Sequence, residues 1–163
     1  MAIETTLSIL RRAPILGLFE DEALRVIANV ADTRRLRPGE VLFRHGDRSD
    51  GGYVVTAGTI AVGRAGAEEP VLLGPASVIG EIALFIRMQR PATATAQEAA
   101  SVLRISPTLM KRVLHEFPSA APAMAEVLTR DLEAVAAGLT SVERLFAEQE
   151  ASERESRGHR DVV

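Results

Sequence analysis

The residues with the most evident chemistry lie between positions 80 and 93, which read GEIALFIRMQRPAT. Gly80 permits a tight turn and the close approach of a ligand. A short helical turn after it would present the backbone N–H groups of Ile82 and Ala83 to an anion. The Glu81 carboxylate can accept hydrogen bonds from sugar hydroxyls, and the planar cation of Arg90 can hold two phosphate oxygens at once. Together these residues predict a pocket for a phosphorylated sugar.

The same residues allow a purely structural interpretation, in which Glu81 and Arg90 form a salt bridge in a domain that binds no ligand.

Catalysis has less support from the sequence than ligand binding. His45, His115 and His159 are scattered, whereas a metal-dependent jelly-roll enzyme needs clustered histidines and a carboxylate. The chain has no cysteine, which excludes thiol catalysis, disulfides and iron–sulfur clusters. No nucleophile–base pair is evident, so we predict no catalytic residue, no metal site and no cofactor.

Composition describes an ordinary globular chain of one domain. It has 163 residues, of which 47% are hydrophobic and 25% charged, and a net charge of −3. This charge gives no basic footprint for nucleic-acid binding. The longest apolar run is far shorter than the ~20 residues of a membrane span, and residues 1–6 show no secretory pattern. We therefore expect a cytoplasmic protein with no membrane partner.

The elements that must position residues 80–93 follow from hydrophobic periodicity. Apolar residues at helical spacing predict two helices within residues 1–31, the first ended by Pro14. A period of two, interrupted by Gly, Pro, Asp and Ser, predicts short strands typical of a sandwich, jelly roll or barrel. The predicted strands are 33–37, 40–44, 52–57, 59–64, 70–73, 92–98 and 101–105. Between strands, residues 80–86 predict a short helix.

Helices resume at Ser106, an N-cap residue followed by Pro107 at the first helical position. Pro118 ends that helix, and Ser119 is the expected cap of a longer one. The longer helix carries an apolar seam in steps of four and three, which favours a partner helix over a lone helix packed on the sheets. We predict a homodimer through this seam, formed by Leu128, Leu132, Val135, Leu139, Val142 and Phe146. Residues 148–163 are polar and predict a solvated tail.

Residues 80–93 resemble the phosphate-binding cassette of cyclic nucleotide-binding domains, with the pattern Gly-Glu-(Leu/Ile)-Ala-Leu, a short loop, then Arg-(Ala/Ser/Thr)-Ala-Thr. This is the family of the catabolite activator protein, the protein kinase A regulatory subunit and cyclic nucleotide-gated channels. The segments PGEVLFRHGD (38–47) and YVVTAG (53–58) are similar to other family signatures.

The resemblance spans residues ~7–137. It implies a mainly β fold: an eight-stranded, jelly-roll-like β-roll with N-terminal helices and a long C-terminal helix. The implied boundaries are 1–31 for the N-terminal helices, 32–105 for the roll with the cassette at 80–92, and 106–147 for the C-terminal helices.

The resemblance also implies ligand-binding roles. Glu81 would bind the ribose 2′-hydroxyl, and Arg90 would pair with the cyclic phosphate. Backbone N–H groups would complete the anion site, while the base would sit in the roll beneath the long helix, where Arg130 could stack on it. The implied ligand-binding residues are Gly80, Glu81, Ile82, Ala83, Arg90, Pro91, Ala92 and Arg130.

Pro91 departs from the family pattern, which has Ala, Ser or Thr at this position. Proline lacks the N–H that the family donates to the phosphate, and it also lacks a hydroxyl. One charge-assisted hydrogen bond is worth roughly 1.5–3 kcal/mol, or about 10- to 100-fold in affinity. We therefore expect binding that is weakened, with cAMP preferred over cGMP.

Two functions remain open at this stage. The first is a cyclic nucleotide-binding regulatory module that signals through its C-terminal helix in a dimer. The alternative is a degenerate domain that serves in dimerisation or protein interaction. A transcription factor of the catabolite activator type would need a helix-turn-helix after the long helix, so we expect no DNA binding by these 163 residues.

Overall fold

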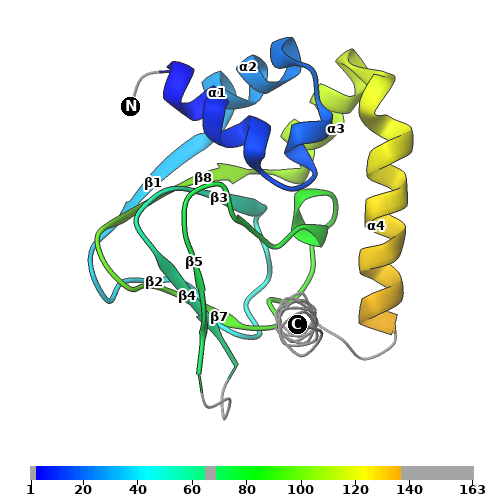
Figure 1. The fold of residues 1–163 in the computed structure, drawn as a ribbon. Helices are drawn as coiled ribbons and strands as arrows, with labels where there is room; N and C mark the ends of the chain where they lie inside the picture. Colours follow the sequence, from blue (N-terminus) through cyan, green and yellow to red (C-terminus); the bar gives the residue numbers. More distant parts are fainter. Residues whose placement is uncertain (1–2, 65–68, 137–163) are drawn as a thin grey trace, which may run out of the picture.

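The computed structural model describes residues 3–64 and 69–136. Two four-stranded antiparallel sheets face each other, and helices lie over the outer face of one sheet and along one side (Figure 1). One sheet has the order β1-β8-β3-β6 and the other β2-β7-β4-β5. This is the mainly β roll with flanking helices that the sequence predicted. The strands are β1 (Asp32–Leu36), β2 (Val41–Phe43), β3 (Gly52–Ala57), β4 (Ile60–Gly63), β5 (Val71–Leu73), β6 (Val78–Ile79), β7 (Thr93–Ala96) and β8 (Ala100–Ile105).

The inner faces of the two sheets enclose one hydrophobic core. Small alanines of β7 pack against larger side chains of the facing sheet, because alternate residues of a strand point to the same face. The buried members are Leu36, Leu42, Tyr53, Val55, Ile60, Val62, Val71, Ile79, Ala92, Ala94, Ala96, Ala100 and Val102. The strand β6 was not among the predicted strands, because its two residues are too few for any periodicity to appear.

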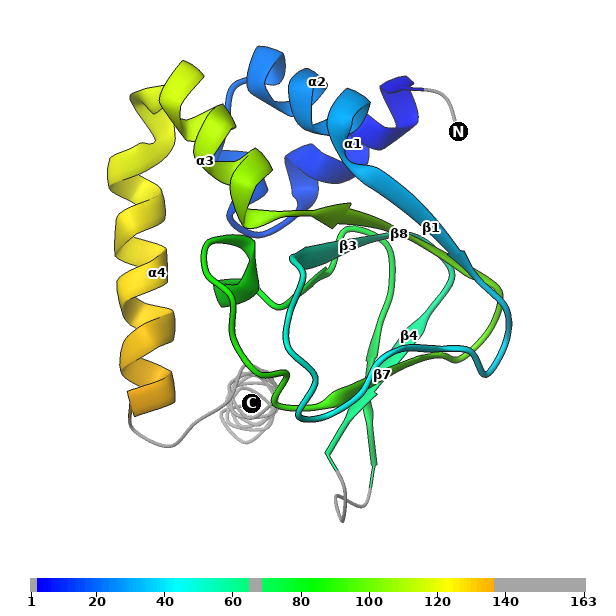
Figure 2. The same ribbon diagram turned by 180° about the vertical axis from the view of Figure 1, so that it is seen from behind.

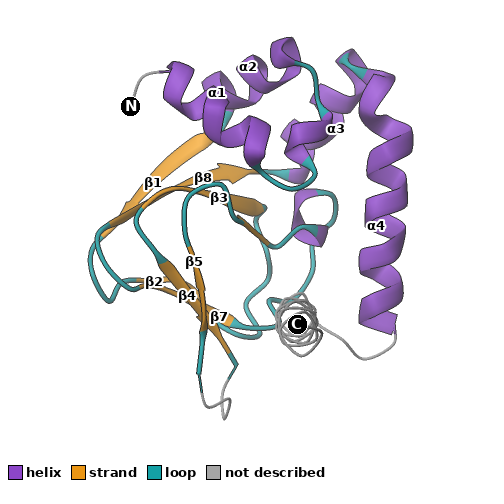
Figure 3. Cartoon of the chain, in the orientation of Figure 1, coloured by secondary structure: helices purple, strands orange, loops and turns teal. Residues whose placement is uncertain are grey.

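A second hydrophobic core joins the helices to the outer face of sheet β1-β8-β3-β6 (Figure 3). The strands contribute Val54, Leu103 and Ile105 to it, each on the opposite face from the inner core. The helices are α1 (Ile3–Arg12), η1 (Leu16–Leu18), α2 (Asp21–Val30), η2 (Ile82–Leu84), α3 (Pro107–Glu116), η3 (Pro118–Ala120) and α4 (Ala121–Ala136). Leu84 of η2 belongs to this second core, so the short helix is anchored among the other helices.

Helix α3 begins as its sequence predicts. The Ser106 hydroxyl accepts a hydrogen bond from Leu109 N at 3.1 Å, and Pro107 takes the first helical position. The next helix differs from the expectation. Ser119 lies inside the 3₁₀ turn η3, and α4 begins at Ala121. Pro118 favours the start of a helical turn as readily as it ends the preceding helix, and η3 therefore takes the place of a Ser119 cap.

Replacing Ser106 by alanine is expected to lower the free energy of unfolding by about 1 kcal/mol, because the Leu109 N–H loses its acceptor. Urea denaturation followed by circular dichroism measures the change. Thr108→Ala is the matched control, since Thr108 is exposed in the same turn. Equal effects of the two substitutions would contradict the capping role.

Helix α4 runs along the molecule beside η2, which Figure 2 shows from behind. Met124 is buried against the helical core, Leu128 is half-buried and Leu132 is 44% exposed. The rest of the predicted seam, including the Val135 side chain, Leu139, Val142 and Phe146, lies outside the described residues, as does the predicted tail. The dimer stays a prediction. No described helix combines the length and the hydropathy that crossing a bilayer would require.

Candidate functional site

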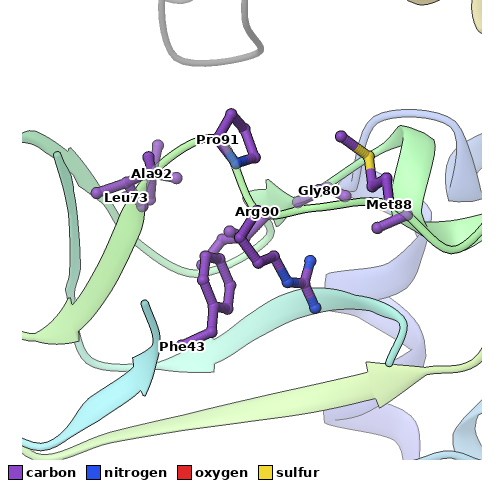
Figure 4. Close-up of a pocket in the computed structure, with 11 residues that line it drawn as sticks. Phe43, Leu73, Gly80, Met88, Arg90, Pro91 and Ala92 are labelled. Atoms are coloured by element: carbon purple, nitrogen blue, oxygen red, sulfur yellow. The ribbon is translucent and has the colours of Figure 1, made fainter. Parts of the chain in front are cut away.

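A hollow opens between the two sheets next to η2. Its wall is mostly apolar and brings together segments far apart in the sequence (Figure 4). Five of the predicted ligand-binding residues line it: Gly80, Ala83, Arg90, Pro91 and Ala92. The remaining wall consists of Phe43, Val62, Leu73, Val78, Ile79 and Met88. The volume is about 40 Å³. That is room for a water-sized group and less than the roughly 300–1,000 Å³ of a typical small-molecule site.

The backbone of Arg90 is held on both sides by the turn that follows β2. Arg90 N donates to Asp47 O at 2.7 Å, and Gly46 N donates to Arg90 O at 2.8 Å. The turn itself is closed by Arg44 N, which donates to the Asp47 carboxylate at 2.9 Å. These bonds fix the backbone of Arg90, and the following proline disfavours the helical region at this residue. The position of Arg90 is thus determined by local and tertiary structure together.

The Arg90 side chain turns away from Pro91 and into the molecule, beside the Phe43 ring (Figure 4). Its guanidinium carbon lies 4.1 Å from the centre of the Phe43 ring and 5.4 Å from that of Tyr53. Nη2 donates to Gly51 O at 2.6 Å and to the Asp50 carboxylate at 3.2 Å. Nε is buried with no hydrogen-bond partner in the structure. The side chain is 2% exposed, so this cation is held by one carboxylate, one carbonyl and two aromatic faces.

Burial lowers the pKa of Arg90, while Tyr53 and Asp50 raise it in partial compensation. Asp50 is shared, because it also accepts a hydrogen bond from the Tyr53 hydroxyl at 2.9 Å. Burial, and then this bond to Asp50, raises the pKa of Tyr53. Arg34 donates to the same hydroxyl at 3.2 Å. The network therefore links the cassette to β1 through polar groups that hold one another in place.

The side chains of η2 point in different directions. Ala83 faces the hollow, whereas Leu84 packs into the helical core. Leu84 N donates to Glu81 O at 3.3 Å and Phe85 N to Ile82 O at 3.0 Å, so the N–H groups of Ile82 and Ala83 precede the first donor of the turn. An added Cβ at Gly52 would lie 2.5 Å from Leu84 Cδ2, so a glycine is needed on β3 for this packing.

Three of the predicted ligand-binding residues do not line the hollow. Glu81 is half-buried at the start of η2, and Ile82 is buried elsewhere. Arg130 is exposed on α4, beside a separate depression formed with Ala125, Glu126 and Thr129. The purely structural interpretation of the sequence paired Arg90 with Glu81. In the structure, the carboxylate that pairs with Arg90 is that of Asp50.

Several residues of the site were not identified as such from the sequence. No motif in the sequence indicates a role for Asp50, yet its carboxylate accepts from Arg90 and Tyr53 and lies 3.9 Å from Arg104 Nη1. Phe43 and Tyr53 belong to quoted signature segments, but no local pattern indicates that their rings flank a cation. This arrangement becomes visible only in the fold, which brings β2, β3 and the cassette close together.

Gly80 adopts a φ of +81°, and a Cβ there would lie 2.9 Å from Arg90 Nη1 and 3.3 Å from Ala83 Cβ. Gly80→Ala is expected to lower the free energy of unfolding by at least about 1–2 kcal/mol through the left-handed backbone alone. The close approach to Nη1 adds to this cost and displaces the guanidinium. Thermal and urea denaturation measure the effect.

Gly74→Ala is the matched control for this experiment, because no atom lies within 4 Å of a Cβ at that position. Its free energy of unfolding should change little. If Gly80→Ala were as harmless as Gly74→Ala, the close contact between Gly80 and the guanidinium would be refuted.

Comparison with known proteins places the chain in a family. The sequence profile of the cyclic nucleotide-binding domain matches residues 33–117. A protein described as a cAMP-dependent protein kinase regulatory subunit, from Pyricularia oryzae, is 26% identical over 106 residues. That match covers 64% of this chain and 27% of the relative, so the chain spans only about a quarter of the relative's length.

Two solved structures have a similar fold. A cyclic nucleotide-binding-like protein from Brucella abortus is 34% identical, with a TM-score of 0.60, over 68% of this chain and 97% of its own. The N-terminal domain of a transcriptional regulator from Streptomyces coelicolor A3(2) is 30% identical, with a TM-score of 0.68, over 80% of this chain and 94% of its own. With the profile match extending over more than half of its residues, this chain belongs to the cyclic nucleotide-binding domain family.

Proposed function

We propose that this chain is a regulatory module that binds a cyclic purine mononucleotide, with cAMP preferred over cGMP. One observation carries the proposal: the Arg90 guanidinium lies against Gly80, at the wall of a hollow that Ala83, Pro91 and Ala92 complete. Among the described residues, Arg90 is the one cation in that wall. A buried guanidinium in an apolar wall is a strong site for a phosphate, because little water screens it.

The ligand would make three kinds of contact. The cyclic phosphate would pair with Arg90 and with backbone N–H groups of the η2 turn. The ribose 2′-hydroxyl would donate to Glu81, which a small movement of η2 would bring to the hollow. The base would lie against apolar side chains of the roll, with Val62 and Leu73 in the wall that faces it. Arg130 would reach the base only if α4 moved toward the cassette, and its role stays a prediction.

The small volume of the hollow implies that binding requires a rearrangement. The bonds of the Arg90 guanidinium to Gly51 O and Asp50 both come from Nη2, so the phosphate would be held by its other N–H groups once the η2 segment had shifted outward. Because Leu84 of η2 packs in the helical core and η2 contacts both α3 and α4, that shift would be transmitted to the helices. A ligand drives such a change only by its differential affinity for the two states. We propose that a dimer formed through the seam of the long helix carries the signal onward.

The relatives support regulation more than catalysis. The Pyricularia oryzae protein is described as a regulatory subunit, and the Streptomyces coelicolor protein as a transcriptional regulator. For this chain, a cyclic nucleotide would therefore be an effector, and we propose no enzymatic reaction.

Titration calorimetry with cAMP, cGMP and 5′-AMP tests the proposal. We expect saturable binding of one cAMP per chain, weaker binding of cGMP, and weaker binding still of 5′-AMP, whose dianionic open phosphate does not match a site for a cyclic monoester. A rise of the melting temperature with cAMP concentration would accompany binding. No saturable heat and no rise in melting temperature at millimolar cAMP or cGMP would refute a nucleotide-binding role.

A second candidate function is a dimerisation or interaction module that has lost its ligand. Two observations favour it: Pro91 has no N–H for the phosphate, and Arg90 already has protein partners in Gly51 O and Asp50. This function predicts that neither the native chain nor a Pro91→Ser variant binds nucleotide, while self-association persists in sedimentation experiments.

A further inference from the structure

A second hollow lies on the outer face of sheet β1-β8-β3-β6, under α1 and α2. Its volume is about 420 Å³, within the roughly 300–1,000 Å³ of small-molecule sites. Helices α1 and α2 contribute Ile3, Thr6, Ala28 and Asn29, and the strands contribute Thr33, Arg35, Thr56, Ser101 and Leu103. The sheet separates it from the nucleotide hollow, because Tyr53 and Val55 point inward while Val54 and Thr56 point outward.

Strand register explains why this part of the sheet is polar. Thr33 pairs with Leu103 and Arg35 with Ser101 across β1 and β8, so these four side chains share the outer face. Further along the same face, Val54, Leu103 and Ile105 are covered by helices. At the other end the face is polar, and there Thr56 lies at a bulge between Val55 and Ala57. The hollow lies where the helices α1 and α2 meet this polar end of the face.

Four polar side chains of the hollow have unused hydrogen-bonding groups within the part of the chain that the structure describes. The side chains of Asn29, Thr33, Arg35 and Ser101 make no hydrogen bond or ion pair with the described residues. Thr56 Oγ1 donates to Ser101 O at 3.1 Å and keeps its own acceptor capacity. Among the described residues, no aspartate or glutamate lines the hollow, so Arg35 meets no counter-charge there. Hydroxyls, an amide and an unpaired guanidinium together favour an anion.

We propose that this hollow binds a small organic anion, a carboxylate or phosphate ester. Its oxyanion would pair with Arg35, the hydroxyls of Thr33 and Ser101 would donate to it, and its carbon skeleton would lie on Leu103 and Ala28. A concave site of this size suits a small molecule better than the flat surface of another protein. The proposal does not depend on nucleotide binding at the other face.

The test is an NMR titration of the full chain, ¹⁵N-labelled, with succinate, glycerol 3-phosphate and inorganic phosphate at constant ionic strength. We expect saturable shifts of the Asn29, Thr33 and Ser101 amides. Succinate represents the carboxylates and glycerol 3-phosphate the phosphate esters. Whichever of the two has the higher affinity should also bind more strongly than inorganic phosphate, because its carbon skeleton contacts the apolar wall. Arg35→Gln should weaken that binding by about tenfold or more, the worth of one charged hydrogen bond.

Arg37→Gln is the matched control, since Arg37 is exposed just after β1 and does not line the hollow. Its affinity for the anion should equal that of the native chain. The proposal is overturned if no probe gives saturable shifts at these amides. It is overturned equally if Arg35→Gln and Arg37→Gln weaken binding to the same extent, because the attraction would then be a general effect of surface charge.

Discussion

Arg90→Gln is expected to weaken cAMP binding by at least about 100-fold, the worth of two charged hydrogen bonds to the phosphate. Among the described residues no other cation lines the hollow, so none replaces the lost charge. The substitution also removes the donor to Gly51 O, a contact of 2.6 Å. We expect the free energy of unfolding to fall by about 1–3 kcal/mol as a result.

Calorimetry well below the melting temperature separates the loss of binding from the loss of stability. Arg87→Gln is the matched control, because Arg87 is an exposed arginine of the same segment. Arg90→Lys keeps the charge without the planar fork, and it should fall between the native chain and Arg90→Gln. If Arg90→Gln folds and binds cAMP as the native chain does, the proposed phosphate contact is wrong.

Pro91→Ser is expected to tighten cAMP binding by about 10- to 100-fold, because it restores a backbone N–H for the phosphate. The backbone of Arg90 is held by Asp47 O and Gly46 N, so the substitution should leave the position of Arg90 intact. The same substitution should lower the free energy of unfolding by about 0.4–1 kcal/mol, since the unfolded chain gains freedom when proline is removed. Affinity and stability are thus expected to change in opposite directions.

Pro91→Ala distinguishes the two groups that serine supplies. Alanine restores the N–H alone, so equal gains with alanine and serine would assign the effect to the backbone. A further gain with serine would assign part of it to the hydroxyl. An unchanged affinity in both variants would mean that the amide at position 91 does not face the phosphate. Absence of binding in every form would instead support the interaction module without a ligand.

Arg90 stabilises the fold in addition to its proposed role in binding the ligand. Arg90 is nearly fully buried beside two aromatic rings, and its hydrogen bonds connect the segment before β7 to the loop before β3. A phosphate would have to reach a guanidinium that is almost completely buried and whose Nη2 already bonds to protein acceptors. This burial, together with Pro91, gives a physical reason to expect modest affinity and a ligand-dependent rearrangement of η2.

The sequence predicted those features that depend on neighbours along the chain. The cap at Ser106, the end of α1 before Pro14 and the strand β3 all follow from residue types within one turn or one strand. The order of motifs around residues 80–93 was enough to identify the family. Element ends were less accurate, as for Ser119, because a proline two residues into a linker can start a 3₁₀ turn as well as stop a helix.

Contacts between distant segments could be decided only by the tertiary structure. Gly51 and Asp50 lie 39 and 40 residues from Arg90 along the chain, and no local pattern distinguishes Asp50 from Glu81 as its carboxylate partner. The placing of Ala83 at the hollow and of Leu84 in the helical core depends on where the sheets and helices meet. So does the polar hollow under α1 and α2. Residue types and spacing by themselves determined the kind of domain and its candidate phosphate-binding segment, because these are properties of short stretches. Packing decided which groups surround the arginine, because burial and distance belong to the folded chain alone.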